Sequence, residues 1–362
     1  MKTFRCDACD QLLFFENTVC LNCGHTLGYL PEENTLSALE PAGNDQWTAL
    51  SPSATAGQLY KMCNNYSQEN VCNWMLPADD PHDLCLSCQL NHIIPNLSQP
   101  EHRTLWARIE NAKRQMVYTL LQLGLPVVGK NDPDEQGIWF DFLAEDQSEG
   151  PVTTGHDNGL ITLNIGEADD AVREKNRRDL GEPYRTLLGH FRHEIGHYYW
   201  DVLVRDDGRL EEFRALFGDE QQDYSESLKR NYEQGAPADW PERFISTYAS
   251  CHPWEDWAET WAHYLHMTDT LETAESFGLR VKRPEKPGTV APKAGTPDES
   301  GYSFDTMLKH WLPLTYALNS LNRSMGHNDL YPFVLSEKVV EKLKFIHQLI
   351  ASSSKTDSTA AA

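Results

Sequence analysis

The chain has 362 residues, enough for two or three cores, and 40% of them are hydrophobic, which is typical of an ordered globular protein. Its formal net charge is −23, from 54 acidic and 31 basic side chains, and this disfavours binding to nucleic acid or anionic lipid. No stretch approaches the roughly 18 consecutive apolar residues of a membrane helix, and no signal peptide precedes Cys6, so we expect a cytoplasmic protein with no membrane partner.

Eight of the nine cysteines lie within the first 88 residues, and this clustering indicates metal binding. Residues 1–30 contain two Cys-x-x-Cys pairs, Cys6 with Cys9 and Cys20 with Cys23. Each pair suits a tight turn around one metal, and together they supply the four thiolates of a tetrahedral Zn²⁺ site of the zinc-ribbon type. Disulfides would instead need an oxidising compartment, for which nothing else in the sequence argues. We therefore predict a first structural zinc site.

Residues 31–57 are rich in Pro, Ser, Gly, Ala and Asn without sustained periodicity, and they are predicted to be a linker. Residues 58–100 are predicted to be a second cysteine-ligated zinc module, although the alternative is free buried thiols beside one redox-inert Cys-x-x-Cys pair. The ligands of this second structural zinc would be Cys63, Cys72, Cys85 and Cys88. The sequence leaves open that a histidine replaces one cysteine in either module, and the candidates are His25, His82 and His92.

Residues 101–350 are assigned to one mainly helical domain with a small sheet, so the fold class is α+β. Apolar residues recur at helical spacing from Leu105 to Leu123, whereas residues 138–143 and 160–165 indicate strands. A helix pattern returns over residues 304–350. The segment 280–303 is expected to be a surface excursion, and the tail 351–362 is expected to be disordered.

A helical pattern over residues 184–204 contains the run HEIGH, with His193, Glu194 and His197. Four residues span just over one helical turn, so the two imidazoles share a face and can hold one Zn²⁺, with Glu194 angled toward a metal-activated water. The alternative is a helix whose histidines are solvated or hydrogen-bonded. The apolar neighbours disfavour it, because uncoordinated histidines and a carboxylate would be costly to desolvate there. His190 shares this face and is a weaker ligand candidate.

Catalytic zinc usually takes three protein ligands, so a third ligand is needed. Pro253 opens a second strongly apolar helix in which Glu255 and Glu259 fall one turn apart. Either carboxylate can bind zinc, and the other would then orient a ligand histidine. The acidic N-terminus of an ordinary helix is the alternative explanation, and it applies better to Glu255 than to Glu259.

The spacing of Tyr248, Glu255 and Glu259 after the HEIGH run is similar to that of gluzincins of the lethal-factor and Mlc-titration-factor kind. This resemblance implies that Tyr248 stabilises the transition state, that Glu255 is the third zinc ligand and that Glu259 supports a ligand by hydrogen bonding. Asp201 would have a similar supporting role, although it follows the second histidine by four residues and not by three as in smaller gluzincins.

Over nearly its whole length the chain resembles bacterial zinc-binding metallopeptidases that begin with a zinc-ribbon domain. This resemblance implies peptide-bond hydrolysis, with Glu194 as general base toward a zinc-activated water and Tyr248 donating to the oxyanion. The features that carry it are the first four cysteines, the CNW run at 72–74, HEIGHYYWD at 193–201, and residues 255–266, 322–326 and 331–335.

A rival interpretation is a zinc-stabilised binding or scaffold protein with a silent HEIGH site, in which the cysteine modules form the recognition surface. Glu194 and Tyr248 distinguish the two, because a structural site needs neither a base nor an oxyanion donor. The hypothesis of hydrolysis requires one catalytic Zn²⁺, one or two structural Zn²⁺ ions and a peptide or protein substrate. The zinc ribbon would be available to a protein partner, and the strand at 160–165 would offer its edge to an extended substrate.

Overall fold

The computed structural model describes residues 1–132, 135–145, 152, 154–180, 186–281 and 303–360. The chain divides into two compact units, residues 1–208 with 353–362, and residues 209–352. The boundary between the units falls inside the region that the sequence assigns to a single domain. The predicted excursion lies outside the described residues over 282–302.

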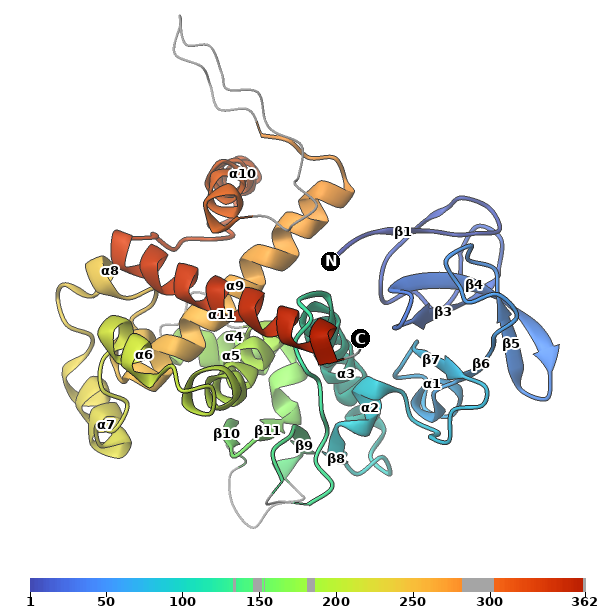
Figure 1. The fold of residues 1–362 in the computed structure, drawn as a ribbon, viewed down its shortest axis with the longest axis horizontal. Helices are drawn as coiled ribbons and strands as arrows, with labels where there is room; N and C mark the ends of the chain where they lie inside the picture. The colour runs from blue at the N-terminus through green and yellow to red at the C-terminus, as the bar shows by residue number, and fades with distance from the viewer. Residues whose placement is uncertain (133–134, 146–151, 153, 181–185, 282–302, 361–362) are drawn as a thin grey trace, which may run out of the picture. The chain divides into compact units, whose positions relative to one another are not determined.

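The first unit begins with two antiparallel sheets, drawn in blue in Figure 1. A two-stranded hairpin precedes a five-stranded meander in which every neighbouring pair is antiparallel, so this region is built from consecutive hairpins. The hairpin strands are β1 (Phe4–Arg5) and β2 (Leu12–Leu13). The meander strands are β3 (Thr26–Leu30), β4 (Thr35–Gly43), β5 (Gln46–Ala49), β6 (Leu59–Met62) and β7 (Met75–Pro77).

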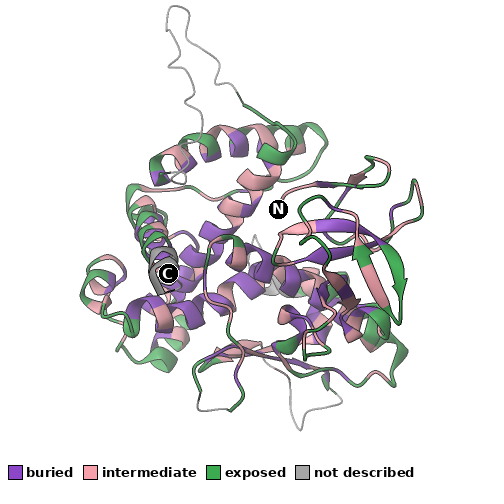
Figure 2. Ribbon diagram, turned by 45° about the vertical axis from the view of Figure 1, so that its right-hand side comes forward, coloured by how far each residue is buried: buried purple, intermediate pink, exposed green. Residues whose placement is uncertain are grey.

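The predicted linker is wrong, because residues 31–57 contain two strands of the meander, β4 and β5. The first half of β4 is buried and pairs with β3, with Leu36 opposite Tyr29, and its second half is exposed. The hairpin of β4 with β5 is accordingly green toward its tip in Figure 2. The register shifts between Pro41 and Gly43, as expected where a proline cannot donate to the ladder. Strands β4 and β5 therefore lie between the two cysteine-containing regions and belong to one five-stranded sheet.

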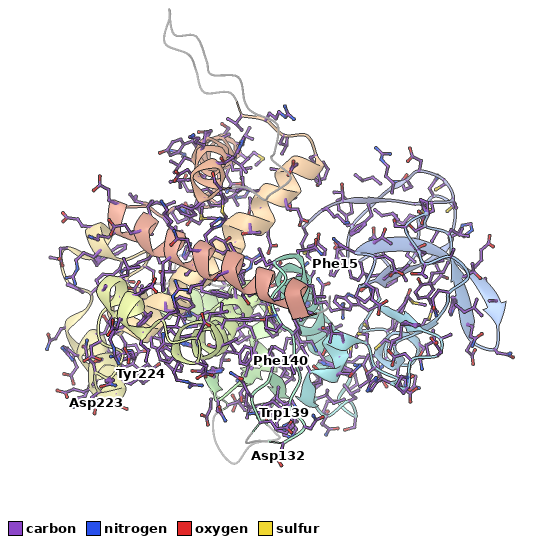
Figure 3. All side chains as sticks on the ribbon, viewed as in Figure 1. Phe15, Asp132, Trp139, Phe140, Asp223 and Tyr224 are labelled. Atoms are coloured by element: carbon purple, nitrogen blue, oxygen red, sulfur yellow. The ribbon has the colours of Figure 1, made fainter. Side chains whose placement is uncertain are left out.

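An aromatic core joins the meander to the long helix α3 (Pro100–Gln122). The ring of Phe15 lies 4.9 Å from that of Tyr29 and 5.3 Å from that of Tyr118, and Tyr29 lies 5.0 Å from Trp74. Figure 3 labels Phe15 at this position. Tyr118 belongs to α3, so the cysteine-rich region packs on this helix through a shared core.

The second sheet of the first unit has the strand order β10-β11-β9-β8. Strand β9 is parallel to both neighbours, whereas β10 is antiparallel to β11. The strands predicted at 138–143 and 160–165 are confirmed, but the second is interior, so the expected edge is wrong, and β10 and β8 are the two edge strands among the described residues. The strands are β8 (Asn91–Ile93), β9 (Trp139–Leu143), β10 (Gly155–Asp157) and β11 (Leu160–Asn164).

Helix α5 (Leu187–Trp200) carries the HEIGH run and packs on this sheet. Its Phe191 ring lies 5.5 Å from Phe140 and 6.2 Å from Phe142, both on β9. The helix begins after Thr186, whose hydroxyl accepts from the amide of Gly189. It continues into a π-helical turn at Asp201–Arg205. The remaining helices of this unit are α1 (Asn64–Ser67), α2 (Leu86–Gln89), α4 (Asp170–Leu180) and the 3₁₀ turn Ile165–Ala168.

The second unit is helical, and its longest helices are α9 (Pro253–Ser276), α10 (Phe304–Ser324) and the part of α11 (Glu337–Ala360) up to residue 352. Trp257 and Trp261 of α9 are fully buried and stack at 5.7 Å. Helix α11 continues to Ala360, so the expected disordered tail is wrong over residues 351–360. Within the described ranges, every helix is too short or too polar to cross a lipid bilayer. The shorter helices are α6 (Leu210–Phe217), α7 (Tyr224–Gln234), α8 (Trp240–Arg243) and the turn Tyr248–Ser250.

Candidate metal sites

The four sulfurs of the first cysteine set lie together at the ends of two tight turns. The Sγ atoms of Cys6 and Cys23 are 3.6 Å apart, as are those of Cys9 and Cys20. Four sulfurs at about 2.3 Å from a tetrahedral zinc would be separated by roughly 3.8 Å, so this set fits the ion. His25 places Nδ1 3.2 Å from the Cys23 sulfur, beside a complete set of four thiols.

The second cysteine set is equally compact and more deeply buried. Cys72 Sγ lies 3.8 Å from the sulfurs of Cys85 and Cys88, and Cys63 completes the group. These distances match the edge of a zinc tetrathiolate, which favours a metal site over the alternative of free thiols. All nine cysteines fall in the described residues, and none forms a disulfide.

His82 and His92, the other histidines considered as ligands, each contact a carboxylate. His82 Nδ1 lies 2.9 Å from Asp80, and His92 Nδ1 lies 2.8 Å from Asp141. The His92 ring also stacks on Trp139 at 4.2 Å. Both histidines thus contact other groups, and the four cysteines of the second set form a complete zinc ligand set without a histidine.

A buried arginine from α3 lies beside the second set. Arg114 is 5% exposed and donates from Nη1 to the carbonyl oxygen of Val71, the residue before Cys72. Burial alone would lower the pKa of Arg114, but the charges of Cys72 and Glu110 outweigh this effect and raise it. Zinc with four thiolates carries a net charge of about −2, so this guanidinium offsets part of the buried charge.

Helix α5 presents the two HEIGH histidines on one face, as the spacing predicts. The His193 and His197 rings are 5.0 Å apart at an interplanar angle of 81°. His197 is 3% exposed, whereas His193 and Glu194 are partly exposed. Two imidazoles at this separation fit two positions of a tetrahedral metal ion, and the partly exposed Glu194 lies next to them along the helix.

A third histidine lies next to this pair, and the sequence analysis missed it. The ring of His156, on the edge strand β10, stacks over His197 at 5.8 Å and 25°. Its Nε2 accepts from the amide of Gly159 at 2.9 Å, which fixes the ring within the β10–β11 turn. Only tertiary structure brings β10 to α5, so no local sequence signal marks His156.

Asp201, the carboxylate expected to support a ligand histidine, pairs with Arg205. The NH1 atom of Arg205 donates to Asp201 Oδ1 at 2.7 Å. Burial raises the pKa of Asp201, and the Arg205 charge opposes this shift. The charge of His197 also acts on the Asp201 carboxylate and lowers its pKa, so Asp201 stays a predicted supporting residue for this histidine.

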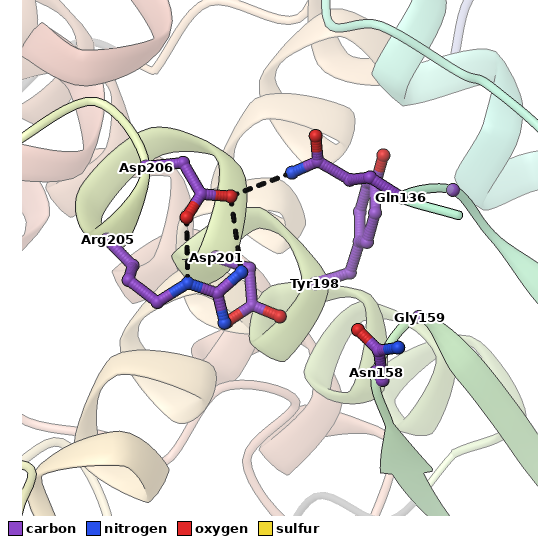
Figure 4. A pocket seen from close by; sticks show the side chains of 8 residues that line it. Gln136, Asn158, Gly159, Tyr198, Asp201, Arg205 and Asp206 are labelled. Atoms are coloured by element: carbon purple, nitrogen blue, oxygen red, sulfur yellow. Dashed lines mark hydrogen bonds and ion pairs between the residues drawn. The ribbon is translucent and has the colours of Figure 1, made fainter. Parts of the chain in front are cut away.

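A polar cavity of about 240 Å³ lies at the end of α5. Figure 4 shows that the guanidinium of Arg205 lies between the carboxylates of Asp201 and Asp206, and that Gln136 donates to Asp206 at 2.9 Å. The charges that line the cavity are therefore already paired with one another. Its lining residues are Gln136, Gly137, Asn158, Gly159, Tyr198, Asp201, Arg205 and Asp206.

In the second unit, both carboxylates proposed for α9 have hydroxyl donors. Glu255 is 1% exposed, and its Oε1 accepts from the Tyr224 hydroxyl at 2.7 Å. Glu259 accepts from the Ser246 hydroxyl at 2.6 Å. Hydroxyl donors orient these carboxylates without cancelling their charge.

Two tyrosines lie near Glu255. Burial, and then the charge of Glu255, raises the pKa of both Tyr224 and Tyr248, so both phenols stay protonated at neutral pH. Tyr248 is the tyrosine singled out by the resemblance. Tyr224 was missed, because a tyrosine at the first position of a helix carries no signal for a contact 31 residues away.

Comparisons with known proteins match both parts of the chain. The family described as "Putative zinc-binding metallo-peptidase" matches residues 102–349, and a zinc-ribbon domain family matches residues 3–99. Proteins of Mycobacterium bovis and Mycobacterium tuberculosis, each described as uncharacterized, are 42% identical over 354 residues, which cover 97% of this chain and 95% of theirs. No solved structure matches.

Proposed function

The chain belongs to the family of putative zinc-binding metallo-peptidases, and from this premise we propose that it hydrolyses peptide bonds at a zinc ion bound by α5. The observation that carries the proposal is the pair His193 and His197 on one face of α5, with Glu194 between them in the sequence. A structural site would need the two histidines but not the neighbouring carboxylate.

We assign the ligands as His193, His197 and Glu255. The two histidines supply neutral nitrogen donors, and Glu255 supplies a carboxylate oxygen, which is one of the donor sets known for catalytic zinc. The burial of Glu255 and its hydrogen bond from Tyr224 support this role, because a ligand carboxylate must be both oriented and shielded from bulk water. The eight clustered cysteines would hold the structural zinc ions.

Bound zinc would supply Lewis-acid activation of a water molecule and of the scissile carbonyl. Glu194 would accept the proton of the attacking water and deliver it to the leaving amine, as a general base and then a general acid. Tyr248 would donate its phenolic hydrogen to the oxygen on which negative charge develops. The protonated state of Tyr248 supports this role, because only a protonated phenol can donate.

The substrate in this proposal is a peptide or protein segment in extended conformation. Strand β10 is one of the two edge strands of its sheet among the described residues, and His156 of this strand stacks on His197. An extended peptide that pairs with this edge would therefore run past the zinc-binding histidines. The edge position of β10 supports substrate addition at this strand, since β11 is interior.

The test is zinc content per chain, measured together with hydrolysis of a mixed peptide library. His193→Ala should lose one zinc of about three, and Glu194→Gln should keep all of them while hydrolysis stops. His327→Ala is the control, because His327 is exposed and far along the chain from these sites. Unchanged zinc in His193→Ala would contradict the zinc site, and hydrolysis that survives in Glu194→Gln would contradict the role of Glu194 as general base. Either outcome would favour the interpretation as a scaffold protein over this mechanism.

A further inference from the structure

We infer that Tyr224 is a positioning residue for the zinc ligand Glu255, a role that rests on the proposed function and extends it. Its phenol holds one carboxylate oxygen, so that the other can face the metal. Tyr224 would thereby set the affinity of the catalytic zinc site without contacting the reacting atoms.

The hydrogen bond between the two side chains is short and shielded. Tyr224 Oη donates to Glu255 Oε1 at 2.7 Å, and the Glu255 side chain is almost completely removed from solvent. A carboxylate can rotate about its terminal bond, and one fixed oxygen removes this freedom before a metal arrives. The bond to Oε1 thereby also fixes the direction in which Oε2 points.

A second residue, His252, fixes Tyr224 relative to α9. Its Nδ1 accepts from the amide of Trp254 at 3.1 Å, which caps the start of α9. The proton of the ring must then be on Nε2, which lies 3.1 Å from the carbonyl oxygen of Gln222 and donates to it. One imidazole therefore connects the first turn of α9 to the residues just before Tyr224.

Tyr224 is also fixed by its own helix and by ring packing. Asp223 caps α7 by accepting from the amide of Glu226 at 2.8 Å, and Tyr224 is the first residue of that helix, as labelled in Figure 3. Its ring meets His252 edge-on at 5.3 Å and Trp254 at 6.0 Å. The phenol is thus held on several sides and can act as a preorganised donor.

In this proposal two neighbouring tyrosines have different tasks, and a hydrogen bond from Tyr248 also reaches Tyr224. Tyr224 directs its hydroxyl at Glu255, and Tyr248 is the one proposed to donate to the substrate oxygen. Removal of a hydrogen bond to a metal ligand typically weakens metal binding about 10–100-fold. Loss of an oxyanion donor instead lowers the rate without a matching loss of metal.

The experiment measures the dissociation constant of the chelator-accessible catalytic zinc by competition with a colorimetric chelator, on the full chain. Tyr224→Phe should weaken binding of this zinc about 10–100-fold, while the cysteine-bound zinc stays in place and reports that the chain is folded. Tyr232→Phe is the matched control, because Tyr232 lies on the same helix and is 70% exposed. Unchanged affinity in Tyr224→Phe would overturn the inference.

A double-mutant cycle separates positioning from a general structural effect. In a Glu255→Gln background, Tyr224→Phe should have little further effect on zinc affinity, because the group that it positions has been changed. An equal further loss in that background would overturn the inference. So would a lower rate with unchanged zinc affinity, which would assign Tyr224 to the reacting atoms. His193→Ala tests the zinc site itself. If this variant keeps all of its zinc, the proposed function is contradicted together with the role of Tyr224, whereas a failure of the Tyr224 experiments alone contradicts only the inference.

Discussion

The Nζ atom of Lys342 donates to Oδ2 of Asp256 at 2.5 Å inside the second unit. Both side chains are buried, with 5% and 0% of their surfaces exposed. Lys342 also donates to the carbonyl oxygen of Arg243 at 2.8 Å. Because Asp256 directly follows Glu255, this ion pair anchors the first turn of α9 to α11.

We predict that Lys342→Met destabilises the protein by about 3–5 kcal/mol, because it leaves a buried carboxylate without its cation. Burial raises the pKa of Asp256 to about 7 against the opposing effect of Lys342, so the measurement is denaturant unfolding above that pH, followed by tryptophan fluorescence. Lys338→Met on the same helix is the control, because Lys338 pairs with the exposed Glu341 and its replacement should cost less than about 0.5 kcal/mol. Equal effects of the two substitutions would contradict the prediction.

Arg114 gives a second prediction, on the metal of the second cysteine set. Arg114→Met should speed the release of this zinc to EDTA about tenfold or more, because the buried negative charge of the site loses a buried cation that interacts with its cysteines. Mass spectrometry after thiol alkylation would show which cysteines become reactive, and those of the second set should react first. Arg103→Met is the control, since Arg103 pairs with Glu69 at the surface of the same helix. Release at the wild-type rate from Arg114→Met would show that the charge of Arg114 does not help the second cysteine set to retain its zinc.

Tyr248→Phe tests the proposed oxyanion donor. The substitution should lower kcat about 10²–10³-fold, while zinc content and zinc affinity stay at the wild-type level. This outcome is the opposite of that expected for Tyr224→Phe, so the two variants are best measured side by side. A loss of zinc in Tyr248→Phe would assign this phenol to the metal ligand instead of the substrate.

The sequence was sufficient for the parts of the fold and of the site that depend on local spacing. Paired cysteines predict tight turns, and the sulfurs of Cys6, Cys9, Cys20 and Cys23 do meet. The four-residue spacing of the HEIGH histidines places them on one face of α5, because the helical repeat requires it. The strand at residues 138–143 was also visible, since a run of buried apolar residues needs no partner to be recognised.

Features that depend on distant partners could not be predicted. Strand β4 contains a serine, a proline and a glycine, and it exists because β3 and β5 pair with it from both sides. The position of β11 inside its sheet depends on β10, only three residues long, which leaves too short a pattern to read. Tyr224 and His156 likewise reach their partners only through tertiary packing.

The last prediction concerns pH and the ion pair that closes the segment between α6 and α7. The Nε atom of Arg214 donates to Glu220 Oε2 at 2.9 Å, and a second guanidinium nitrogen contacts Oε1. The hydrogen bonds from Arg214 lower the pKa of Glu220 below its usual value. A lowered pKa in the folded state stabilises the fold above the unfolded pKa, about 4.3, and this contribution is lost as the pH falls through the folded pKa.

Glu220→Gln should therefore cost about 0.5–1 kcal/mol at pH 7, where the partly exposed pair is complete, and progressively less as the pH falls through the lowered folded-state pKa of Glu220. The measurement is the difference in unfolding free energy between wild type and variant at each pH, in which the pH dependence of zinc binding cancels. Glu233→Gln serves as control, because Glu233 is 61% exposed and lies 3.9 Å from Lys229. A difference between wild type and Glu220→Gln that stays constant from pH 7 to pH 3 would mean that packing, not charge, makes Glu220 stabilising.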